Sequence, residues 1–310
     1  PMPLTALSIL LPVYNWPVGE LVTELHRQAT AEPGLTVEIL AFDDASPDTA
    51  LHAANRAALG ALPGVEYRVL PANVGRAACR NLLAAAARHP WLLFLDADSA
   101  LPDGQFLSRY RAAVADDSAP LAWIGGTAYH PTPPADPALR LRWTYGRARE
   151  QRPAVHRRQA PYAAFTLNNL LIRADTYAAL GGLDERLGRT YGHEDTALGG
   201  ALAAAAVPLG HLDNPVLHVG LEPAAAFRAK TEQAVRNLVR LARTGQPGAV
   251  ASPLWQLAAR LKRVGLATAA RRALALAELR LLRNLDSEAP SLRAFDAWRL
   301  LVVLRELVRG

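Results

Sequence analysis

The sequence has a single cysteine, few aromatic residues and no long apolar segment. Because Cys79 is alone, an intrachain disulfide and a zinc site built from cysteines are both excluded. Aromatic side chains make up 6% of the 310 residues, which argues against a stacking platform for nucleic-acid bases. No run of about 18 apolar residues is present, and no basic segment precedes the short apolar run at residues 7–11. We therefore expect no transmembrane helix, no signal peptide and a cytoplasmic protein.

Two common phosphate-binding signatures are also missing. Neither Gly-x-Gly-x-x-Gly nor Gly-x-x-x-x-Gly-Lys follows the first apolar run, so a dinucleotide fingerprint and a P-loop are excluded. The composition is that of a folded protein, with 51% hydrophobic and 20% charged residues. The length suits one large domain or two ordinary ones.

Apolar runs and helical patterns alternate over the first 125 residues. The apolar runs predict buried strands at residues 7–13, 37–42, 65–70 and 91–95. Helical patterns separate them at residues 18–31, 49–59 and 76–88. This alternation predicts an α/β fold, with a mostly parallel central sheet flanked by helices.

The rest of the chain is less regular and then becomes purely helical. Further strands are expected at residues 121–127, 165–172 and 215–219, and helices at 174–180 and 194–206, with 197–210 forming a buried helix and a turn. From residue 223 onward only helical patterns occur, at 224–243, 253–269, 271–285 and 291–308. We predict a sheet domain at residues 1–222 and an α-helical C-terminal region at 223–310.

Polar residues follow each of the first four predicted strands. They are Asn15, Asp43-Asp44, Asn73-Val74-Gly75-Arg76 and Asp96-Ala97-Asp98. Because ligands of open parallel sheets bind at the carboxyl ends of the strands, these residues predict a ligand site at that edge. Each one alone is also a common helix cap or turn residue. Four such groups at matching strand ends favour a site.

Asp96 and Asp98 are carboxylates two residues apart, which would point the same way from an extended chain. Together with diphosphate oxygens and water they suit Mg²⁺ or Mn²⁺, which prefer oxygen ligands. His218, in the short strand at residues 215–219, is either a third metal ligand or a hydrogen-bonded core residue.

Glu194 and Asp195 are adjacent carboxylates at the start of a predicted helix. One interpretation is a helix N-terminus stabilised by negative charge. The other is a general base that takes a proton from a hydroxyl nucleophile. These two residues alone leave both interpretations open.

Six motifs, in this order and at these spacings, resemble family 2 glycosyltransferases with the GT-A fold. The motifs are Pro12-Val13-Tyr14-Asn15, Asp43-Asp44-Ala45-Ser46, Asn73-Val74-Gly75-Arg76-Ala77-Ala78-Cys79-Arg80-Asn81, Leu95-Asp96-Ala97-Asp98, Asn168-Asn169 and His193-Glu194-Asp195. The resemblance covers about residues 7–222. It implies inverting transfer of a sugar from a nucleotide-sugar donor, usually UDP-linked, with Mg²⁺ or Mn²⁺ as cofactor.

The resemblance also implies which residues contact the donor. The nucleotide base would lie against Pro12, Val13, Tyr14 and Asn15, and Asp44 would accept a hydrogen bond from it. The segment with Asn73, Gly75 and Arg76 would reach the base or the phosphates. Asp96, with the adjoining Ala97, would bind the ribose, and Asp98 would bind the metal together with His218.

For the reaction itself, the resemblance implies that Asp195 is the catalytic base and that Glu194 contacts the acceptor or the donor sugar. Asn168, Asn169 and His193 would lie near the donor sugar or the acceptor. A Gln-x-x-Arg-Trp motif, which many processive synthases have, is absent. Its absence favours transfer of one sugar per binding event to a glycan or a lipid-linked acceptor.

Two other functions stay open from the sequence. The first is a catalytically inactive nucleotide-sugar-binding or scaffolding protein of the same fold, against which the intact acidic motifs argue. The second is a nucleotidyltransferase, which usually has a glycine-rich signature near the first strand. Residues 10–16 have no such signature.

The net charge of +6 is unevenly distributed. Residues 224–310 contain 16 basic and 6 acidic residues, a net of +10, whereas the preceding residues have a net of −4. The basic residues recur among Leu and Ala at helical spacing. They indicate either a solvated helix face or a peripheral contact with an anionic membrane or a lipid-linked acceptor. No nucleic-acid partner is expected, since no known binding motif is present.

Overall fold

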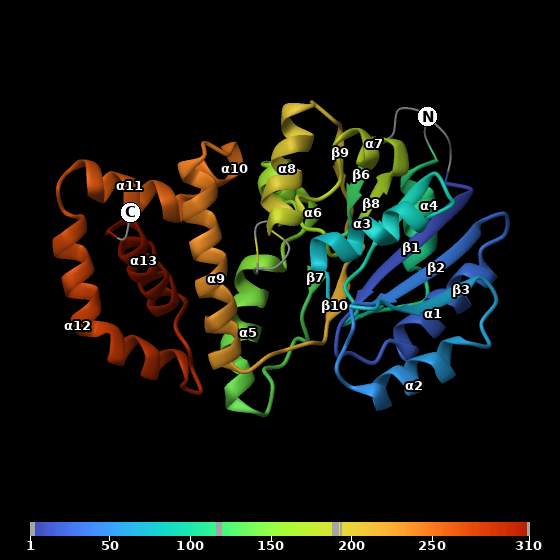
Figure 1. Ribbon diagram of the computed structural model, residues 1–310, viewed down its shortest axis with the longest axis horizontal. Coiled ribbons are helices and arrows are strands. Elements are labelled where there is room, and N and C mark those ends of the chain that lie inside the picture. The colour runs from blue at the N-terminus through green and yellow to red at the C-terminus, as the bar shows by residue number, and fades with distance from the viewer. Residues whose placement is uncertain (1–3, 116–119, 188–191, 193, 309–310) are drawn as a thin grey trace.

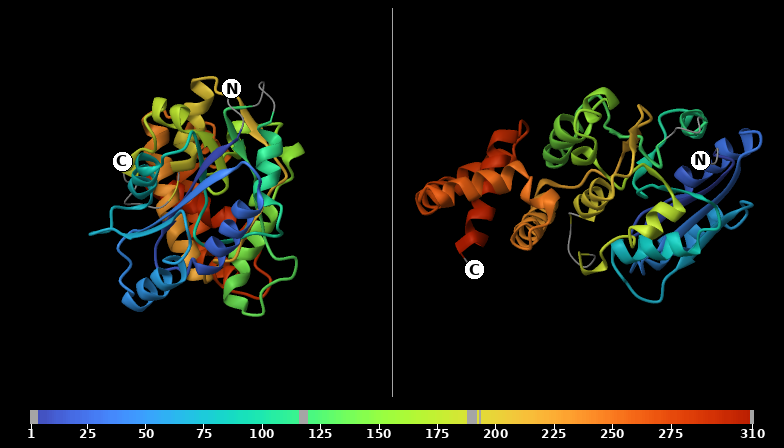
Figure 2. Two further views of the ribbon diagram at one scale, coloured as in Figure 1. Left: turned by 90° about the vertical axis from the view of Figure 1, so that its right-hand side faces the viewer. Right: turned by 90° about the horizontal axis from the view of Figure 1, so that it is seen from above.

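The computed structural model describes residues 4–308 except 116–119, 188–191 and 193. The molecule is elongated, with a sheet-based part at one end and a purely helical part at the other (Figure 1, Figure 2). Within the described ranges, no helix combines the length and the apolar character that crossing a membrane requires.

A seven-stranded sheet in the order β3-β2-β1-β4-β8-β6-β9 forms the centre of the N-terminal part. Its strands are β1 (Ala6–Val13), β2 (Thr36–Asp43), β3 (Val65–Val69), β4 (Trp91–Phe94), β6 (Ala122–Ile124), β8 (Leu170–Arg173) and β9 (Leu209–His211). Only β8 is antiparallel to its neighbours, β4 and β6. The predicted α/β fold with a mostly parallel sheet is confirmed.

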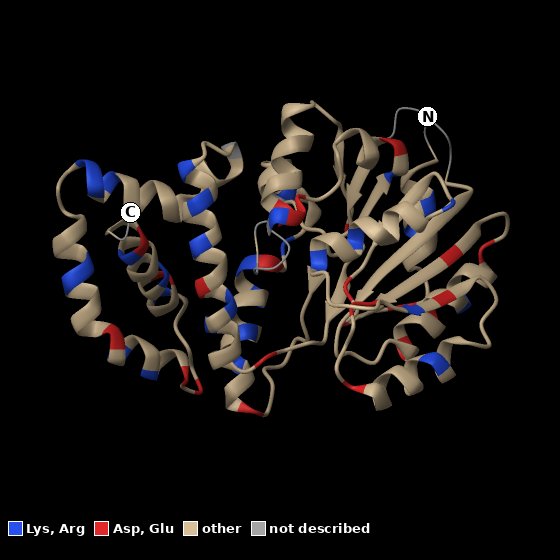
Figure 3. Cartoon of the chain, in the orientation of Figure 1, with Lys and Arg blue, Asp and Glu red and all other residues tan. Residues whose placement is uncertain are grey.

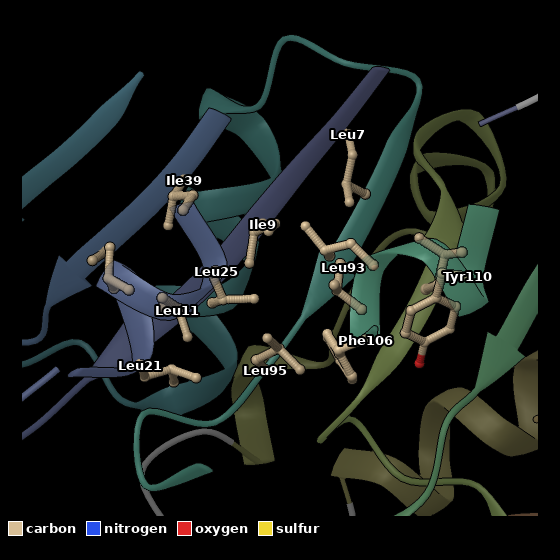
Figure 4. Close-up of a cluster of buried hydrophobic side chains, with 14 of the residues drawn as sticks. Leu7, Ile9, Leu11, Leu21, Leu25, Ile39, Leu93, Leu95, Phe106 and Tyr110 are labelled. Carbon is tan, nitrogen blue, oxygen red and sulfur yellow. The ribbon is translucent and has the colours of Figure 1, made fainter. Parts of the chain in front are cut away.

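Helices cover both faces of this sheet, because its central strands are apolar on both sides. The helices are α1 (Gly19–Ala31), α2 (Thr49–Leu59), α3 (Arg76–Ala86), α4 (Phe106–Ala113), α7 (Ala174–Ala179) and α8 (Glu194–Ala204). In β1, Ile9 and Leu11 pack with α1 and α4 in the cluster drawn in Figure 4, whereas Leu10 packs with α3, α7 and α8 on the other face. This alternation follows from the two-residue period of a strand.

Three predicted segments of the sheet-based part differ markedly from the structure. The strand expected at residues 121–127 is two strands in separate sheets, because the chain turns at Gly126, whose φ is 96°. The strand expected at residues 165–172 is shortened to β8, since the backbone before it turns at Asn169, whose φ is 67°. Residues 197–210 are more than a helix and a turn, because their end forms part of the edge strand β9, which pairs with β6.

A second, three-stranded sheet lies beside the first and was not predicted. It has the order β5-β10-β7, with β5 at Ser99–Ala100, β7 at Thr127–Ala128 and β10 at Val216–His218. The antiparallel pairing of β10 with β5 sets His218 opposite Ser99. This register brings His218 close to Asp98, although the two residues are far apart in the sequence.

Short helical segments lie between the strands and longer helices of residues 137–187. They are η1 (Pro137–Leu139), α5 (Arg140–Tyr145), the π-helical turn η2 (Gly146–Glu150), α6 (Ala154–Arg157), η3 (Pro161–Ala164) and η4 (Glu185–Leu187). Helix α5 packs against the C-terminal region through a ring cluster in which Tyr145 lies 5.3 Å from Phe227 and 5.4 Å from Phe295, between ring centroids.

The C-terminal region is purely helical, as predicted. It consists of α9 (Ala224–Arg243), α10 (Pro247–Val250), α11 (Pro253–Arg263), α12 (Ala267–Leu285) and α13 (Leu292–Val308). The helix expected at residues 253–269 is shorter in the structure, because the chain turns at Gly265, whose φ is 74°.

Candidate active site

A cleft of about 560 Å³ opens between the sheet-based part and the C-terminal helices. Seven of the residues predicted for the site line it: Arg76, Asp96, Asp98, Asn168, Glu194, Asp195 and His218. Lys230 of α9 and Arg299 of α13 also line it. The helical region is therefore a wall of this cleft and not a detached extension.

Asp98 and His218 form a pair inside the cleft. The distance from Asp98 Oδ1 to His218 Nδ1 is 3.5 Å. Burial raises the pKa of Asp98, but the neighbouring His218 and Arg142 outweigh it, so the net shift is downward. Gly220 lies so close that a Cβ there would be 2.2 Å from Asp98 Oδ2.

The donor atoms of this pair suit a hard or borderline divalent cation. Among the described residues, His218 Nε2 is one of the few buried side-chain nitrogens with no hydrogen-bond partner. No group of three or more His, Cys, Asp or Glu side chains within the described ranges is arranged to hold a metal ion. The described residues thus place two candidate ligands side by side at this point rather than a complete cage.

Asp96 faces a different partner from Asp98. The residues Ala97-Asp98 form a turn, so the extended chain expected between the two carboxylates is wrong, although both line the cleft. Arg80 Nη2 donates to Asp96 Oδ1 at 2.6 Å. The buried Arg80 belongs to the motif at residues 73–81 but was given no role from the sequence, although its spacing of four from Arg76 places both on one side of α3.

Asp195 lies partly exposed at the cleft, at the start of α8. Burial, the adjacent Glu194 and Asp96 raise the pKa of Asp195 to about 6, against the opposing charges of Arg80 and Arg76. A carboxylate with a pKa near neutrality is suited to accept a proton under physiological conditions.

Glu194, next to this group, is buried and paired. Arg76 Nη2 donates to Glu194 Oε1 at 3.2 Å. Two residues that were predicted from separate motifs, at the start of α3 and the start of α8, are thus brought into contact.

The residues predicted to hold the nucleotide base lie at the adjoining strand ends rather than in the lining of this cleft. Both oxygens of the buried Asp44 accept backbone hydrogen bonds, from Val74 N at 2.7 Å and from Gly75 N at 2.9 Å. Asn73 Nδ2 donates to Asp44 O at 2.9 Å. Asp44 therefore fixes the loop that leads into α3.

The loop after β1 is held in a similar way. Asn15 has a φ of 49°, and its N–H donates to Ser46 Oγ at 2.8 Å. Val13 is buried, Pro12 is partly buried, and the Tyr14 side chain is 52% exposed. Ala97 is buried beneath the turn. Tyr14 is the one large hydrophobic residue of this loop that is exposed in the described structure.

The two adjacent asparagines have different surroundings. Asn168 lines the cleft, and its Oδ1 accepts from Asp96 N at 3.1 Å. Asn169 is fully buried, and its Nδ2 donates to Gly126 O and Asn214 O, each at 2.8 Å. The expected position of Asn169 beside the sugar or acceptor is therefore corrected, because its side chain is used to hold loops together. His193 lies outside the described residues.

A second set of cleft residues was not found from the sequence. The carboxylate of Glu150, in η2, accepts from Arg142 Nη2 at 3.0 Å and also from the hydroxyl of Tyr129. The ring of Tyr129 in turn lies 5.4 Å from that of His218, between centroids. In the sequence, only the many basic residues at positions 140–158 could have indicated these cleft residues. They did not show which of the arginines point into the cleft.

The fold is shared with solved glycosyltransferases. The mannosyltransferase PcManGT from Pyrobaculum calidifontis, solved with GDP-Man and Mn²⁺, is 16% identical with a TM-score of 0.59, over 97% of this chain and 84% of that one. S. aureus TarS 1–349, solved with UDP-GlcNAc, is 15% identical with a TM-score of 0.54, over 98% and 92%. At these identities the likeness shows the fold, which is that of GT-A glycosyltransferases.

A third structure is the glucosyl-3-phosphoglycerate synthase from Mycobacterium tuberculosis, solved with Mn²⁺, UDP-glucose and glycerol 3-phosphate. It is 15% identical with a TM-score of 0.51, over 78% of this chain and 81% of that one. No curated protein sequence matches this chain. The model of the glycosyl transferase family 2 matches residues 8–166, which is about half of the chain. The chain therefore belongs to the family 2 glycosyltransferases.

Proposed function

We propose that this chain is an inverting, metal-dependent glycosyltransferase. It would move one sugar from a UDP-linked donor to a hydroxyl of a glycan or a lipid-linked acceptor. The observation that carries this proposal is that Asp98, His218 and Asp195 line one cleft. A pair of metal ligands and a proton acceptor of raised pKa match the two needs of such a transfer.

Asp98 and His218 are the proposed ligands of Mg²⁺ or Mn²⁺. Their oxygen and nitrogen atoms are neighbours at 3.5 Å, and the other positions around the ion would be left to diphosphate oxygens and water. Mn²⁺ in the structures of PcManGT and of the M. tuberculosis synthase supports this proposal. When bound, the ion supplies positive charge that stabilises the leaving diphosphate.

Asp195 is the proposed base. The acceptor oxygen forms a bond to C1 of the sugar on the face opposite the diphosphate. The bond from C1 to the diphosphate oxygen breaks, its electron pair leaves with that oxygen, and the hydroxyl proton passes to the Asp195 carboxylate. Holding the acceptor oxygen and C1 in line contributes further to the rate enhancement.

The proposed nucleotide site lies at the strand ends next to the cleft. Pro12, Val13, Tyr14 and Asn15 would contact the base, and the lone pairs of Asp44 that its backbone partners leave would accept a base N–H. Asn73, Gly75 and Arg76 would line the path to the phosphates, and Asp96 with Ala97 would contact the ribose. The UDP-sugars in TarS and the M. tuberculosis synthase support UDP, whereas PcManGT was solved with a GDP-sugar.

Nucleotide release tests the proposal. The full chain is incubated with a panel of UDP- and GDP-sugars after chelation, and then with Mn²⁺ or Mg²⁺ restored. We expect release of UDP from one donor, dependent on the cation. If no nucleotide sugar raises the melting temperature and none is turned over, the proposal is wrong. Binding without turnover for any acceptor would instead favour an inactive nucleotide-sugar-binding protein.

The assignment of the base has its own test. Asp195→Asn should lower kcat about 10²–10⁴-fold, since general base catalysis is worth that much, and should leave donor affinity nearly unchanged. Asp103→Asn, at an exposed position that does not line the cleft, is the matched control and should keep wild-type turnover. Near-wild-type turnover of Asp195→Asn would refute the assignment.

A further inference from the structure

The outer surface of α11 and α12 exposes an unusual number of large apolar side chains. Five of the eleven exposed large hydrophobic residues in the described chain lie on this hairpin: Leu257, Val264, Leu266, Leu276 and Leu279. Leu276 is 89% exposed and Leu279 is 69% exposed. Leu276 and Leu279 are three positions apart and therefore adjacent on one side of α12, and adjacent exposed apolar groups of this size mark an interaction surface.

Basic residues share this surface. On α12, positions 272, 276, 279, 280 and 283 fall within an arc of about 100° of one helix. Arg272, Arg280 and Arg283 are therefore interleaved with the two exposed leucines, and all five side chains are exposed. Arg260, Lys262 and Arg263 of α11 are exposed as well. These six basic residues and the five exposed apolar residues of the hairpin, eleven in all, are called the α11–α12 face below.

Acidic residues are absent from this face. Between Glu232 and Asp286 the sequence has ten Arg and Lys residues and one acid, Glu278. Glu278 is turned inward, where its carboxylate accepts from both Arg305 Nη atoms of α13 at 2.7 Å. Figure 3 shows the basic residues recurring along α11 and α12. The exposed arc is thus cationic and apolar together.

We infer that the α11–α12 face docks on an anionic lipid bilayer. A helix surface that combines leucines with basic residues lies at the membrane interface, the leucines entering the acyl boundary and the cations meeting acidic headgroups. Two other occupants fit the surface less well. A two-fold contact between copies of this face would set its cations against one another. Nucleic acid would use the cations but would leave the leucines without a partner.

The position of the face is compatible with turnover at the cleft. Figure 1 places α11 and α12 at the end of the molecule remote from the sheet, with α9 between them and the sheet-based part. The cleft is lined from α9 and α13, and none of the eleven residues of the face lines it. Docking would leave the cleft open while holding the enzyme where lipid-linked acceptors are found. The lipid contact itself does not depend on the proposed sugar transfer.

Flotation of the full chain with vesicles tests the inference. Vesicles of phosphatidylcholine alone are compared with vesicles that also contain phosphatidylglycerol. We expect binding only to the anionic vesicles, weakening as salt is raised. Leu276→Glu/Leu279→Glu should abolish binding. Arg280→Gln/Arg283→Gln should weaken it roughly thirtyfold, since each basic residue near the surface contributes about fivefold.

Matched variants on the sheet-based part test whether vesicle binding depends on the α11–α12 face itself or only on the overall charge and hydrophobicity of the protein. Leu82→Glu removes an exposed leucine of α3, and Arg27→Gln/Arg56→Gln removes the same charge from α1 and α2. Both controls should bind anionic vesicles like the wild type. All these variants should keep wild-type nucleotide release in solution, so failure of the lipid contact is distinguishable from failure of the proposed function.

Three results would overturn the inference. The first is equal binding to neutral and anionic vesicles, and the second is unchanged binding by the leucine variant. The third is a wild-type chain that binds no vesicle but self-associates, with Leu276→Glu/Leu279→Glu restoring the monomer in sedimentation equilibrium. That result would assign the face to a second copy of the chain.

Discussion

At the scale of single residues, the raised pKa of Asp195 links the proposed chemistry to folding stability. The pKa of the Asp195 carboxyl is 3.8 in the unfolded chain and is raised to about 6 in the folded one. Between these values the folded state binds more protons, so stability is lost as the pH rises from about 4 to about 6. Asp195→Asn removes this loss. The variant should be more stable than the wild type above pH 6 by on the order of 2–3 kcal/mol.

Urea unfolding at several pH values measures this difference. The gap between variant and wild type should shrink as the pH falls through the same window and should be small near pH 4. Glu20→Gln, at an exposed position of α1, should track the wild type throughout. A gap that stays constant with pH would mean that the variant acts through packing and not through the charge of Asp195.

Gly220 offers a second test, at the proposed metal pair. A Cβ at this position would lie 2.2 Å from Asp98 Oδ2, so Gly220→Ala must displace the carboxylate. Because groups that orient a ligand typically govern 10–100-fold in metal affinity, the Mn²⁺ concentration for half-maximal activity should rise by about that factor. Gly200→Ala is the control, since a Cβ there meets nothing within 4 Å. An unchanged Mn²⁺ titration for Gly220→Ala would argue against Asp98 as a ligand.

The site could be predicted from sequence where its residues belong to short motifs. Asp98, Asp195 and Glu194 were found because strand ends and helix starts are local features, and the structure brings them to one cleft. His218 was found as a ligand candidate, but its approach to Asp98 depends on the pairing of two short strands. The burial of Asn169 depends on three loops that meet only in the folded chain, and no local pattern reports such a meeting.

At the scale of elements, a ring cluster joins α5 to the C-terminal helices. Phe295 is 1% exposed, and its ring lies 5.3 Å from that of Phe227 and 5.8 Å from that of Trp298. Phe295→Ala should lower the free energy of unfolding by about 3–5 kcal/mol, since it leaves a cavity in this cluster. It should also reduce turnover, because Phe295 lines the cleft. Urea unfolding and nucleotide release measure the two effects.

The control for this prediction is Leu276→Ala on α12. That side chain is 89% exposed, so its loss should change stability by less than about 0.5 kcal/mol. Equal stability of Phe295→Ala and the wild type would mean that the ring cluster does not hold α5 against α13.

Elements with strong periodicity were predicted well, and short ones were not. The helix at 224–243 and the helix at 49–59 have the predicted bounds. The strands β5 and β9, of two and three residues, escaped prediction, because so few residues set no periodic pattern. The break between α11 and α12 falls at a glycine of positive φ, within a run that otherwise reads as continuous helix.

At the scale of the whole molecule, the proposed boundary near residue 222 separates an acidic part from a basic part. The hydrophobic core, however, continues across this boundary. The acidic part and the basic part meet along buried apolar groups: Leu141 of α5 is fully buried among residues of α9 and α13. Helix α8 contributes Ala197 to a further cluster with Leu241 and Ala249. The two parts are therefore expected to fold as one cooperative unit.

Removal of residues 223–310 tests this expectation. The remaining chain would expose Leu141, Tyr145 and part of α8 to water and would lose the cleft wall formed by α9 and α13. We expect it to aggregate or to unfold without a cooperative transition, and to release no nucleotide, as judged by size-exclusion chromatography, thermal unfolding and the release assay beside the full chain. A monomeric, cooperatively folded fragment with wild-type nucleotide release would show two independent domains. The helical region would then act only as an attachment. Loss of nucleotide release by a fragment that still folds would mean that the helical region is needed only to complete the cleft.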